Sequence, residues 1–446
     1  MCRRAPDAPG CFGQGGSAGA SGAGGGGGPA GASGNGTGGA SGLGGGGSGG
    51  GGGCDSDTEC AAAAGSLCVT GLCTEPSATC AAGTLVVVPD PAFAGALEGG
   101  LEGACFYRAL GPALAVAATN AGTTTRVVAY AAAVEGPAVV PGGVRLEGRA
   151  TAPAVLVELT AGGAGAAGAG GAGGGAAPAL VTLGDGAALA GFALDAAGAV
   201  GVRVASGKAS LEGPLELRGG KPALSVEGTA AATVTGKAEA PVLFVGNVRG
   251  VRVSPTAGLS MTGDKSEAGL VLEGTDGGAA VLIEAGDSSA GVSVTGARFR
   301  GTTGGDVLGG TGAIEVRSGR KVALADNVFE NNNRGLNLNG GGTSAPDAFV
   351  NVSLVGNRFV VGVSAGVAIC GALLNASSTL LFLGAGNALP SGVVATQTDC
   401  SALTQQGNCN GGATPGQRDL GVLDIAKPFV VQCPSLPPRS VGGASP

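Results

Sequence analysis

The sequence predicts an all-β solenoid, a fold in which successive coils of short strands stack along one axis. The main observation is a pattern that returns four times, at intervals of 30 residues, between residues 291 and 391. Each unit has two apolar residues spaced two apart, as one face of a strand requires, followed by a turn and another apolar residue. A fixed repeat of this length and strand content is typical of stacked coils that share one core. The positions in register are Val292, Val322, Val352 and Phe382; Val294, Leu324, Leu354 and Gly384; Ala297, Asn327, Asn357 and Asn387; and Phe299, Phe329, Phe359 and Leu389.

A turn marks the corner of each repeat, where the residue before the third position is Gly296, Asp326, Gly356 or Gly386. Gly tolerates the left-handed backbone that a tight corner needs, and Asp and Asn are common in turns. The asparagines stacked at the next position predict a hydrogen-bonded ladder, and the stacked phenylalanines predict ring stacking in the interior. A less regular group of asparagines stays open as a binding loop: Asn331, Asn332, Asn333, Asn337 and Asn339.

Composition excludes several classes of protein. The chain has 446 residues, of which 95 are Gly and 23 are Pro, and it contains no Trp and no His. Gly without a three-residue period excludes collagen, and the absence of His excludes Ser-His-Asp sites and imidazole metal ligands. A net charge of −7 argues against nucleic acid or an anionic membrane surface as the partner. No apolar run reaches the roughly 18 residues that a transmembrane helix needs.

Cysteine usage predicts an oxidising compartment. The chain has twelve Cys, an even number, and no CxxC pair, which argues against zinc ribbons and thioredoxin-like sites. We therefore predict disulfides and an extracellular, outer-surface or periplasmic location. Residues 1–4 lack the apolar core of a signal peptide, so either the start lies too far downstream or export uses another route. The cysteines predicted to form disulfides are Cys54, Cys60, Cys68, Cys73, Cys80, Cys105, Cys370, Cys400, Cys409 and Cys433.

Residues 1–53 are mostly Gly, Ser and Ala, and this composition predicts a disordered tether. A cysteine followed by such a tether, as at Cys11, resembles the mature start of a bacterial lipoprotein. The resemblance implies a lipid anchor on Cys11. Two departures from the lipoprotein signal are that Ala8 stands where Leu is usual and that no apolar stretch precedes it.

Residues 54–80 form a cysteine cluster that is too small to own a hydrophobic core and would need disulfides to hold a shape. Its first four cysteines allow three pairings, and the sequence does not choose among them. Their spacing resembles short four-cysteine modules that follow linkers in bacterial surface proteins. Asp55, Asp57 and Glu59 are candidate Ca²⁺ ligands, but the EF-hand pattern is absent and solvated acids in a disulfide knot explain the same residues.

The predicted β-helix spans residues 81–395. Its first predicted elements are a strand at 85–88, a helix at 105–118, and strands at 127–130 and 144–148. Phe106, Leu110, Leu114 and Ala117 share one face of that helix. This order resembles the entry of the right-handed parallel β-helices of the pectin-lyase-like superfamily. The resemblance implies a right-handed parallel β-helix whose first coil is capped by the helix, because a bare end would expose an open sheet edge.

Looser coils of the same kind continue through residues 150–290, and the coils stop after Pro390. Beyond that point lie Cys400, Cys409 and Cys433, and Cys370 lies in the last coils. These four cysteines predict that residues 396–446 form a disulfide-tied C-terminal cap with a loose tail.

The 30-residue repeat places Arg300 one coil from Glu330 and gathers several charged residues near one corner. In the β-helix polysaccharide lyases that the chain resembles, acidic residues hold Ca²⁺ and a basic residue abstracts a proton, whereas polygalacturonase-like relatives use several acids. Four residues near this corner are the candidates for either chemistry, although they match no catalytic motif of the family: Asp326, Glu330, Arg334 and Lys321. The alternative is structural, with an Arg300–Glu330 ion pair and Asp326 as an ordinary turn residue.

Two functions remain open. The first is a non-catalytic exported or cell-surface β-helix with a structural, adhesive or binding role, no cofactor, and polysaccharide or an envelope protein as its partner; we expect a monomer. The second is a carbohydrate-active enzyme, either a polysaccharide lyase or a glycoside hydrolase, with Ca²⁺ as a candidate cofactor, and it rests on fold analogy alone. The scarcity of Trp and Tyr, on which sugar rings usually stack, favours the first.

Overall fold

The computed structural model divides the chain into two units, Met1–Gly50 and Gly51–Pro446, and all the residues described below belong to the second. These residues are 67–69, 72–74, 83–89, 105–149, 156–161, 178–264, 267–275, 277–286, 290–302, 312–317, 321–332, 334–339, 350–360, 365–370, 379–388, 394–397 and 429–432. Several predictions lie outside the described residues, namely those for the tether at 1–53 and for Cys11, Cys54, Asp55, Asp57, Glu59, Cys60, Cys80, Cys400, Cys409 and Cys433.

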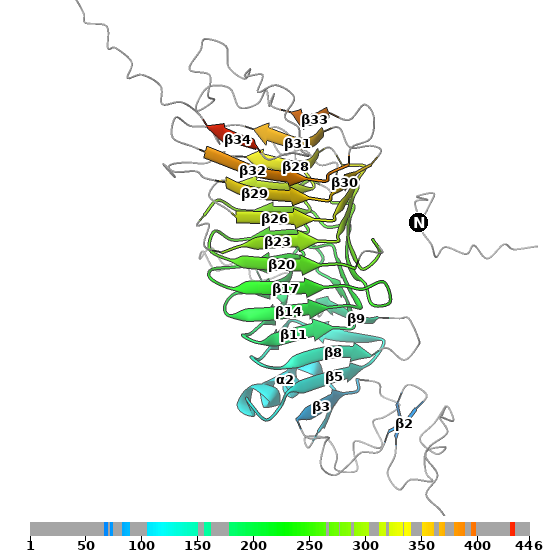
Figure 1. Cartoon of the computed structure of the whole chain (residues 1–446). Coiled ribbons are helices and arrows are strands. Elements are labelled where there is room, and N and C mark those ends of the chain that lie inside the picture. The colour runs from blue at the N-terminus through cyan, green and yellow to red at the C-terminus, as the bar shows by residue number, and fades with distance from the viewer. Residues whose placement is uncertain are drawn as a thin grey trace, which may run out of the picture. The chain divides into compact units, whose positions relative to one another are not determined.

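The described residues form a right-handed parallel β-helix built from three sheets, which confirms the predicted fold class (Figure 1). The 13 strands of sheet I are β3 Thr84–Val87, β4 Phe106–Tyr107, β5 Arg126–Tyr130, β8 Arg145–Arg149, β11 Ala187–Ala190, β14 Lys208–Glu212, β17 Ala231–Thr235, β20 Gly258–Thr262, β23 Val292–Thr295, β26 Lys321–Ala325, β29 Val350–Val355, β32 Thr379–Ala385 and β34 Phe429–Gln432.

The chain passes from sheet I to sheet II and then to sheet III before it returns to sheet I one coil further on. Sheet II contains β6 Ala133–Gly136, β9 Val157–Ala161, β12 Phe192–Asp195, β15 Leu215–Arg218, β18 Val242–Val245, β21 Leu270–Glu273, β24 Arg298–Arg300, β27 Val328–Glu330 and β30 Arg358–Phe359. Sheet III contains β7 Ala138–Val140, β10 Ala179–Leu183, β13 Val200–Val204, β16 Leu224–Val226, β19 Val251–Val253, β22 Val281–Ile283, β25 Ile314–Arg317, β28 Arg334–Asn339, β31 Ala365–Cys370 and β33 Val394–Gln397. A separate two-stranded antiparallel sheet pairs β1 Leu67–Val69 with β2 Leu72–Thr74 and places Cys68 opposite Cys73.

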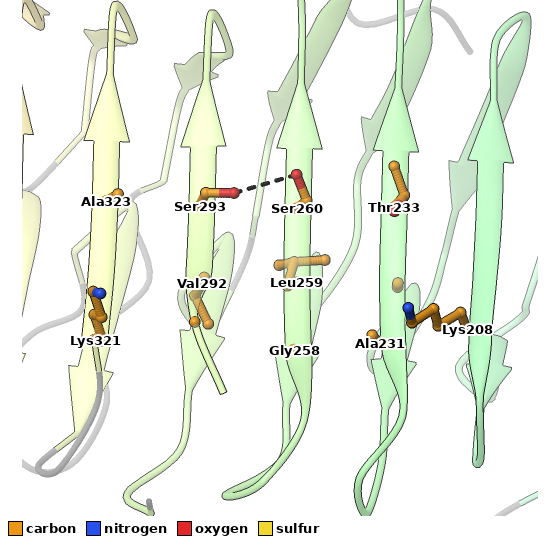
Figure 2. Close-up of a pocket in the computed structure, with 12 residues that line it drawn as sticks. Lys208, Ala231, Thr233, Gly258, Leu259, Ser260, Val292, Ser293, Lys321 and Ala323 are labelled. Carbon is orange, nitrogen blue, oxygen red and sulfur yellow. Dashed lines mark hydrogen bonds between the residues drawn. The ribbon is translucent and has the colours of Figure 1, made fainter. Parts of the chain in front are cut away.

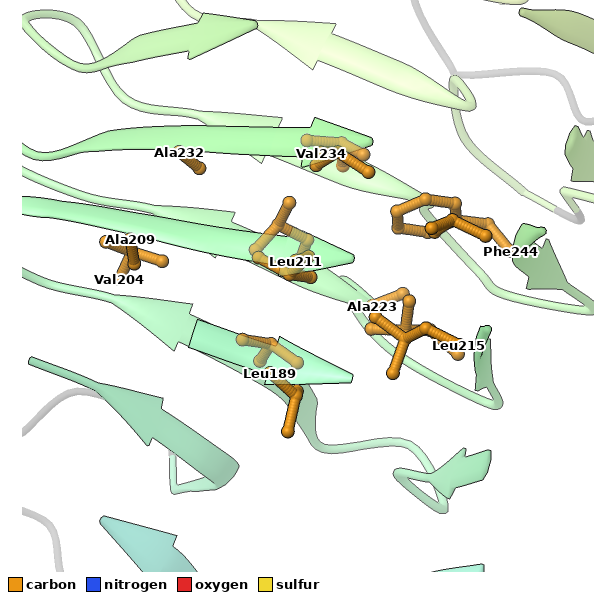
Figure 3. Packing of buried hydrophobic residues seen from close by; sticks show 14 of the residues in the cluster. Leu189, Val204, Ala209, Leu211, Leu215, Ala223, Ala232, Val234 and Phe244 are labelled. Carbon is orange, nitrogen blue, oxygen red and sulfur yellow. The ribbon is translucent and has the colours of Figure 1, made fainter. Parts of the chain in front are cut away.

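The core is one continuous column of apolar side chains that runs through the coils from Leu85 to Phe359. Side chains alternate between the two faces of each strand, so every second residue of all three sheets points inward. Figure 3 shows this packing, with Leu211 of sheet I, Phe244 of sheet II and Val204 of sheet III converging on the interior. Each coil therefore buries its apolar residues only by stacking on its neighbours.

The 30-residue repeat is confirmed by the strand register. Val292 pairs with Val322, Val322 pairs with Val352, and Val352 pairs with Phe382 on successive strands of sheet I. On sheet II the predicted phenylalanine column is also in register and fully buried. Its ring centroids are 5.0 Å apart between Phe299 and Phe329 and 4.9 Å apart between Phe329 and Phe359, and the rings are nearly parallel.

The corner between sheets I and II carries the predicted asparagine ladder. The Nδ2 atom of Asn327 donates to Oδ1 of Asn357 at 2.9 Å, and Nδ2 of Asn357 donates to Oδ1 of Asn387 at 3.1 Å. The backbone N–H of Asn327 also donates to Oδ1 of Asn357, at 3.0 Å. The preceding residue is left-handed in every coil of the repeat, including Asp326 at φ 54°, which fits its role as a turn residue.

A second polar corner, between sheets II and III, was not predicted. Asn247 and Asn332 are each 1% exposed, and both follow a residue with positive φ. The Oδ1 atom of Asn332 accepts from the backbone N–H of Thr302 at 2.9 Å, and its Nδ2 donates to the carbonyl of Phe299 at 3.0 Å. Asn332 is therefore a structural residue of this corner, whereas its neighbour Asn331 is exposed.

The N-terminal end of the β-helix is covered by one helix, α2 Leu110–Thr119, which buries Leu110, Ala113, Leu114 and Ala117. The predicted helix began five residues too early, because Phe106 lies in strand β4 and pairs with β3 instead. Pro112 is accommodated in the first helical turn, where its missing N–H has no intrahelical partner to lose. Cys105 is 2% exposed and is disulfide-bonded.

At the C-terminal end the parallel stack continues slightly beyond the predicted limit, because β33 pairs in parallel with β31, which ends at Cys370. The final strand, β34, pairs with β32 in the antiparallel direction. Within the described residues, α2 is far too short to cross a membrane, and no other helix there is long and apolar enough to do so.

Candidate binding groove on sheet I

The outer face of sheet I carries three aligned rows of side chains between β14 and β26, and most of these side chains are small. Row A runs through Lys208, Ala231, Gly258, Gly291 and Lys321. Row B runs through Ser210, Thr233, Ser260, Ser293 and Ala323. Row C continues with Thr235, Thr262 and Thr295. Three consecutive strands therefore present a hydroxyl, a buried apolar residue and a second hydroxyl.

Rows A and B line an open groove of about 530 Å³, whose residues Figure 2 shows from close by. Its floor is made by residues that keep side-chain volume low, above all Gly258 and Gly291 of row A. Thr233, Ser260 and Ser293 of row B supply hydroxyl groups, and Oγ of Ser293 donates to Oγ of Ser260 at 3.2 Å. The groove crosses the strands, so it follows the direction in which the coils stack.

The two lysines stand at opposite ends of this groove, one on β14 and one on β26 (Figure 2). Lys208 is fixed by the coil below it, because its backbone N–H donates to Oδ1 of Asp185 at 2.7 Å. Both lysine side chains are exposed. Four interstrand steps separate their strands, which is about 19 Å at an interstrand spacing of about 4.8 Å.

These lysines differ from most arginines of the β-helix in having no acidic partner among the described residues. On sheet II, Nε of Arg298 donates to Oε2 of Glu330 at 3.1 Å, and Nη2 of Arg300 lies 3.6 Å from Oε1 of Glu273. In the described part of the chain, no carboxylate lies within ion-pair distance of Lys208 or Lys321. Two lysines without an ion-pair partner among the described residues therefore border the groove.

The Arg298–Glu330 pair corrects one expectation. Strand register does place Arg300 next to Glu330, as predicted. The carboxylate of Glu330 nevertheless turns diagonally to Arg298, and Arg300 turns to Glu273 on the other side. Both arginines lie on the outer face of β24, and their long side chains can reach carboxylates of more than one neighbouring strand.

The four candidate catalytic residues lie along one coil, each at or next to the end of a strand, on three different strands. Lys321 begins β26 and lines the groove, whereas exposed Asp326 follows the other end of that strand, about 16 Å away at roughly 3.3 Å per residue. Glu330 ends β27 and is paired with Arg298. Arg334 begins β28, and burial lowers its pKa. The coil thus separates Lys321 from the other three, and a catalytic role for the group stays a prediction.

Sheet III carries a second charged group on its outer side, and its charges are largely paired with one another. Nε of Arg252 donates to Oε1 of Glu284 at 3.0 Å, and Nε of Arg317 donates to Oε1 of Glu315 at 3.1 Å. Glu315 is only 3% exposed. Burial is also the main reason why the pKa of the neighbouring Arg249 is lowered. This cluster stabilises the wall of the β-helix and leaves little charge for a ligand.

Among the described residues, no group of three His, Cys, Asp or Glu side chains is placed to hold a metal ion.

Glu147 on β8 is the centre of an ion-pair network near the N-terminal end. Its carboxylate accepts from Nε of Arg149 at 2.8 Å and from Nε of Arg126 at 3.1 Å, and Arg145 lies 3.6 Å away. Burial opposes ionisation of this carboxyl group, but the hydrogen bonds from Arg149 and Arg126 outweigh it, so its pKa is lowered. Ionised Glu147 therefore holds together arginines that would otherwise repel one another.

The substitution Glu147→Gln is expected to reduce the free energy of unfolding by about 1–2 kcal/mol at neutral pH, because it removes charged hydrogen bonds. A lowered folded-state pKa gives stability that is present above the ordinary Glu pKa of about 4.3 and is lost as pH falls through the folded value. The cost of the substitution should therefore shrink at pH 3. Urea unfolding at both pH values checks this, with Glu135→Gln at an exposed site as the neutral control. A cost that is equal at both pH values would contradict it.

The sequence pattern does not predict the groove, because the repeat of apolar residues describes only the inward-facing positions of the strands. The available signal was the recurrence of a hydroxyl residue at alternate positions, as in Thr233–Val234–Thr235 and Ser260–Met261–Thr262. These hydroxyl residues can be recognised as aligned rows only when the register of the strands is known. Spacings between the looser coils are unequal, so the row that joins Lys208 to Lys321 was not visible as a repeat.

Comparison with protein-family models finds no match, and no curated protein matches the chain. Two solved structures are similar to it. The crystal structure of an alginate lyase from Paenibacillus sp. str. FPU-7 has 14% sequence identity and a TM-score of 0.31, and the match covers 64% of this chain and 95% of that one. PfbA, a surface adhesin of Streptococcus pneumoniae, has 10% identity and a TM-score of 0.30, covering 72% of this chain and 94% of that one. At such low values neither similarity indicates a ligand or an activity for this chain.

Proposed function

We propose that this protein is a non-catalytic β-helix of the cell surface or extracellular space that binds an extended polysaccharide along the groove on sheet I. The observation that carries the proposal is the groove itself, which is open, about 530 Å³ in volume and floored by hydroxyl groups and glycine. Hydroxyl rows can exchange hydrogen bonds with sugar hydroxyls, and an open floor admits a linear chain without a closed pocket.

The lining of the groove favours binding over cleavage. Hydrolysis of a glycosidic bond usually needs two carboxyl groups on opposite sides of the bond, and no Asp or Glu of the described residues lines the groove. Proton abstraction by a lyase needs a base and a second group that stabilises charge on the same sugar. The strands that carry Lys208 and Lys321 are about 19 Å apart at the interstrand spacing, which places the two lysines at different sugars of an extended chain.

A glycine of the floor provides the test. Replacing Gly291 by Gln would fill the groove, and the structure tolerates it, because a Cβ atom at Gly291 meets nothing within 4 Å. We expect Gly291→Gln to weaken binding of soluble polysaccharides by about tenfold or more, equivalent to about 1.4 kcal/mol. Gly111→Gln is the matched control, since Gly111 is also open and lies in α2, outside the groove.

Binding is measured by affinity electrophoresis or calorimetry, and the chain length of the polysaccharide is measured before and after incubation. Equal thermal midpoints for the two variants establish that any difference in binding is local. Loss of binding in both variants, or in neither, would remove the groove as the site. Shortening of the polysaccharide would overturn the non-catalytic proposal and favour the carbohydrate-active enzyme.

A further inference from the structure

The charge pattern of the groove is uneven along its length. Row A begins at Lys208 and ends at Lys321, and the three residues between them, Ala231, Gly258 and Gly291, carry neither charge nor bulk. The adjoining residues of row B are uncharged as well. A ligand that follows the groove therefore meets a cation, a neutral stretch with hydroxyl groups, and a second cation.

The fold does not require the small residues of row A. Neither Gly258 nor Gly291 has a positive φ. A Cβ atom at Gly258 would lie 3.5 Å from Cβ of Ala231, which is an ordinary contact, and one at Gly291 would lie in open space. Many glycines at the corners differ in this respect, as at Gly296, where φ is 65° and a Cβ would approach a backbone oxygen at 2.8 Å. The glycines of row A keep the path between the lysines clear.

The net charge of the chain limits the kind of anion that fits this path. At −7, the protein as a whole repels a dense polyanion at long range. Two lysines on strands about 19 Å apart, at about 4.8 Å per strand, could neutralise only a small part of a chain that carries a carboxylate on every sugar. The remaining carboxylates would lie over uncharged hydroxyl groups and lose hydration without compensation.

We propose that the ligand is a heteropolysaccharide with widely spaced anionic groups, in which neutral sugars lie over rows A and B and successive anionic groups reach Lys208 and Lys321. This inference rests on the proposed function, because it assumes that a polysaccharide occupies the groove. It adds the charge pattern of that polysaccharide and makes the two lysines the residues that determine specificity. Neutral chains bind the same floor more weakly, and densely charged chains are disfavoured.

The test compares fragments of three polysaccharides of matched length on the full chain. They are gellan, with one carboxylate in each tetrasaccharide repeat, dextran, which is neutral, and polygalacturonate, which is charged on every sugar. We expect gellan fragments to bind most tightly. We expect the double variant Lys208→Gln, Lys321→Gln to lower their affinity by about tenfold and to reduce its dependence on salt. Lys237→Gln, at an exposed lysine that is not part of the groove lining, is the control and should change neither.

The outcomes separate this inference from the proposed function. Equal binding of gellan and dextran, unaffected by the double variant but abolished by Gly291→Gln, would overturn the charge pattern and keep the groove. Tightest binding of polygalacturonate would also overturn the charge pattern. Absence of binding to all three would overturn both proposals together. A weakened gellan affinity in the double variant, with dextran binding and the thermal midpoint unchanged, supports the inference.

Discussion

Replacement of Phe329 by Ala is expected to reduce the free energy of unfolding by about 3–5 kcal/mol, the range observed for large-to-small changes in closely packed cores. Phe329 is fully buried and stacks between two other rings, at centroid distances of 5.0 and 4.9 Å. Its removal would leave Phe299 and Phe359 facing a cavity with no common neighbour. Urea unfolding followed by circular dichroism measures the loss.

The control for this prediction is Phe329→Leu, which retains most of the volume and should cost about 1–2 kcal/mol. Phe359→Ala is a second comparison, because it removes one ring contact from the column where Phe329→Ala removes two. A cost below 1 kcal/mol for Phe329→Ala, or equal costs for Ala and Leu at this position, would contradict the role of the ring stack.

Replacement of Asn357 by Leu should cost about as much, for a different reason. Asn357 is 0% exposed, and its amide joins three coils: Oδ1 accepts from Asn327, and Nδ2 donates to the carbonyl of Leu324 at 3.0 Å and to Asn387. The substitution leaves several buried polar groups without partners, at about 1–3 kcal/mol each. We expect a total loss of about 3–5 kcal/mol, measured by urea unfolding.

Hydrogen exchange gives a local readout for the same variant. The backbone N–H of Asn327 donates to Oδ1 of Asn357 at 3.0 Å, so this amide should exchange much faster in Asn357→Leu. Asn387→Leu is the matched control at the partly exposed end of the ladder, where water can replace a lost partner and the cost should be smaller. Unchanged protection of the Asn327 amide would show that the ladder does not hold this corner.

The sequence predicted the interior of the β-helix better than its surface, for a physical reason. Core positions must be apolar and in register in every coil. The stacked core residues in the columns of Val292 and Phe299 therefore recur in the sequence every 30 residues. Phe106 was misplaced because an apolar residue next to a helix fits a strand equally well, and only pairing with β3 decides between them. Local pattern alone cannot supply that pairing.

Surface residues are less constrained, and the candidate site was therefore less predictable. The sequence predicts Lys321 as a site residue, but it places Lys321 in one group with residues that lie beyond the other end of its strand, such as Asp326. Lys208 was not singled out, because its relation to Lys321 depends on four strand pairings between coils of unequal length. The sequence does not predict the ion-pair partner of Glu330 correctly either, since several flexible arginines lie within reach of this carboxylate.

The coil-on-coil construction makes the separation of the two lysines an adjustable length. Each coil contacts its immediate neighbours, so one further coil inserted between β20 and β23 would leave both lysine environments intact and move them apart by a single step of about 4.8 Å. Deletion of a coil would shorten the separation by the same step. The number of coils between the two lysines would then set the spacing of anionic groups that the groove accepts. Duplication of a coil would fit the groove to a ligand with a longer repeat, and both lysines would stay unchanged.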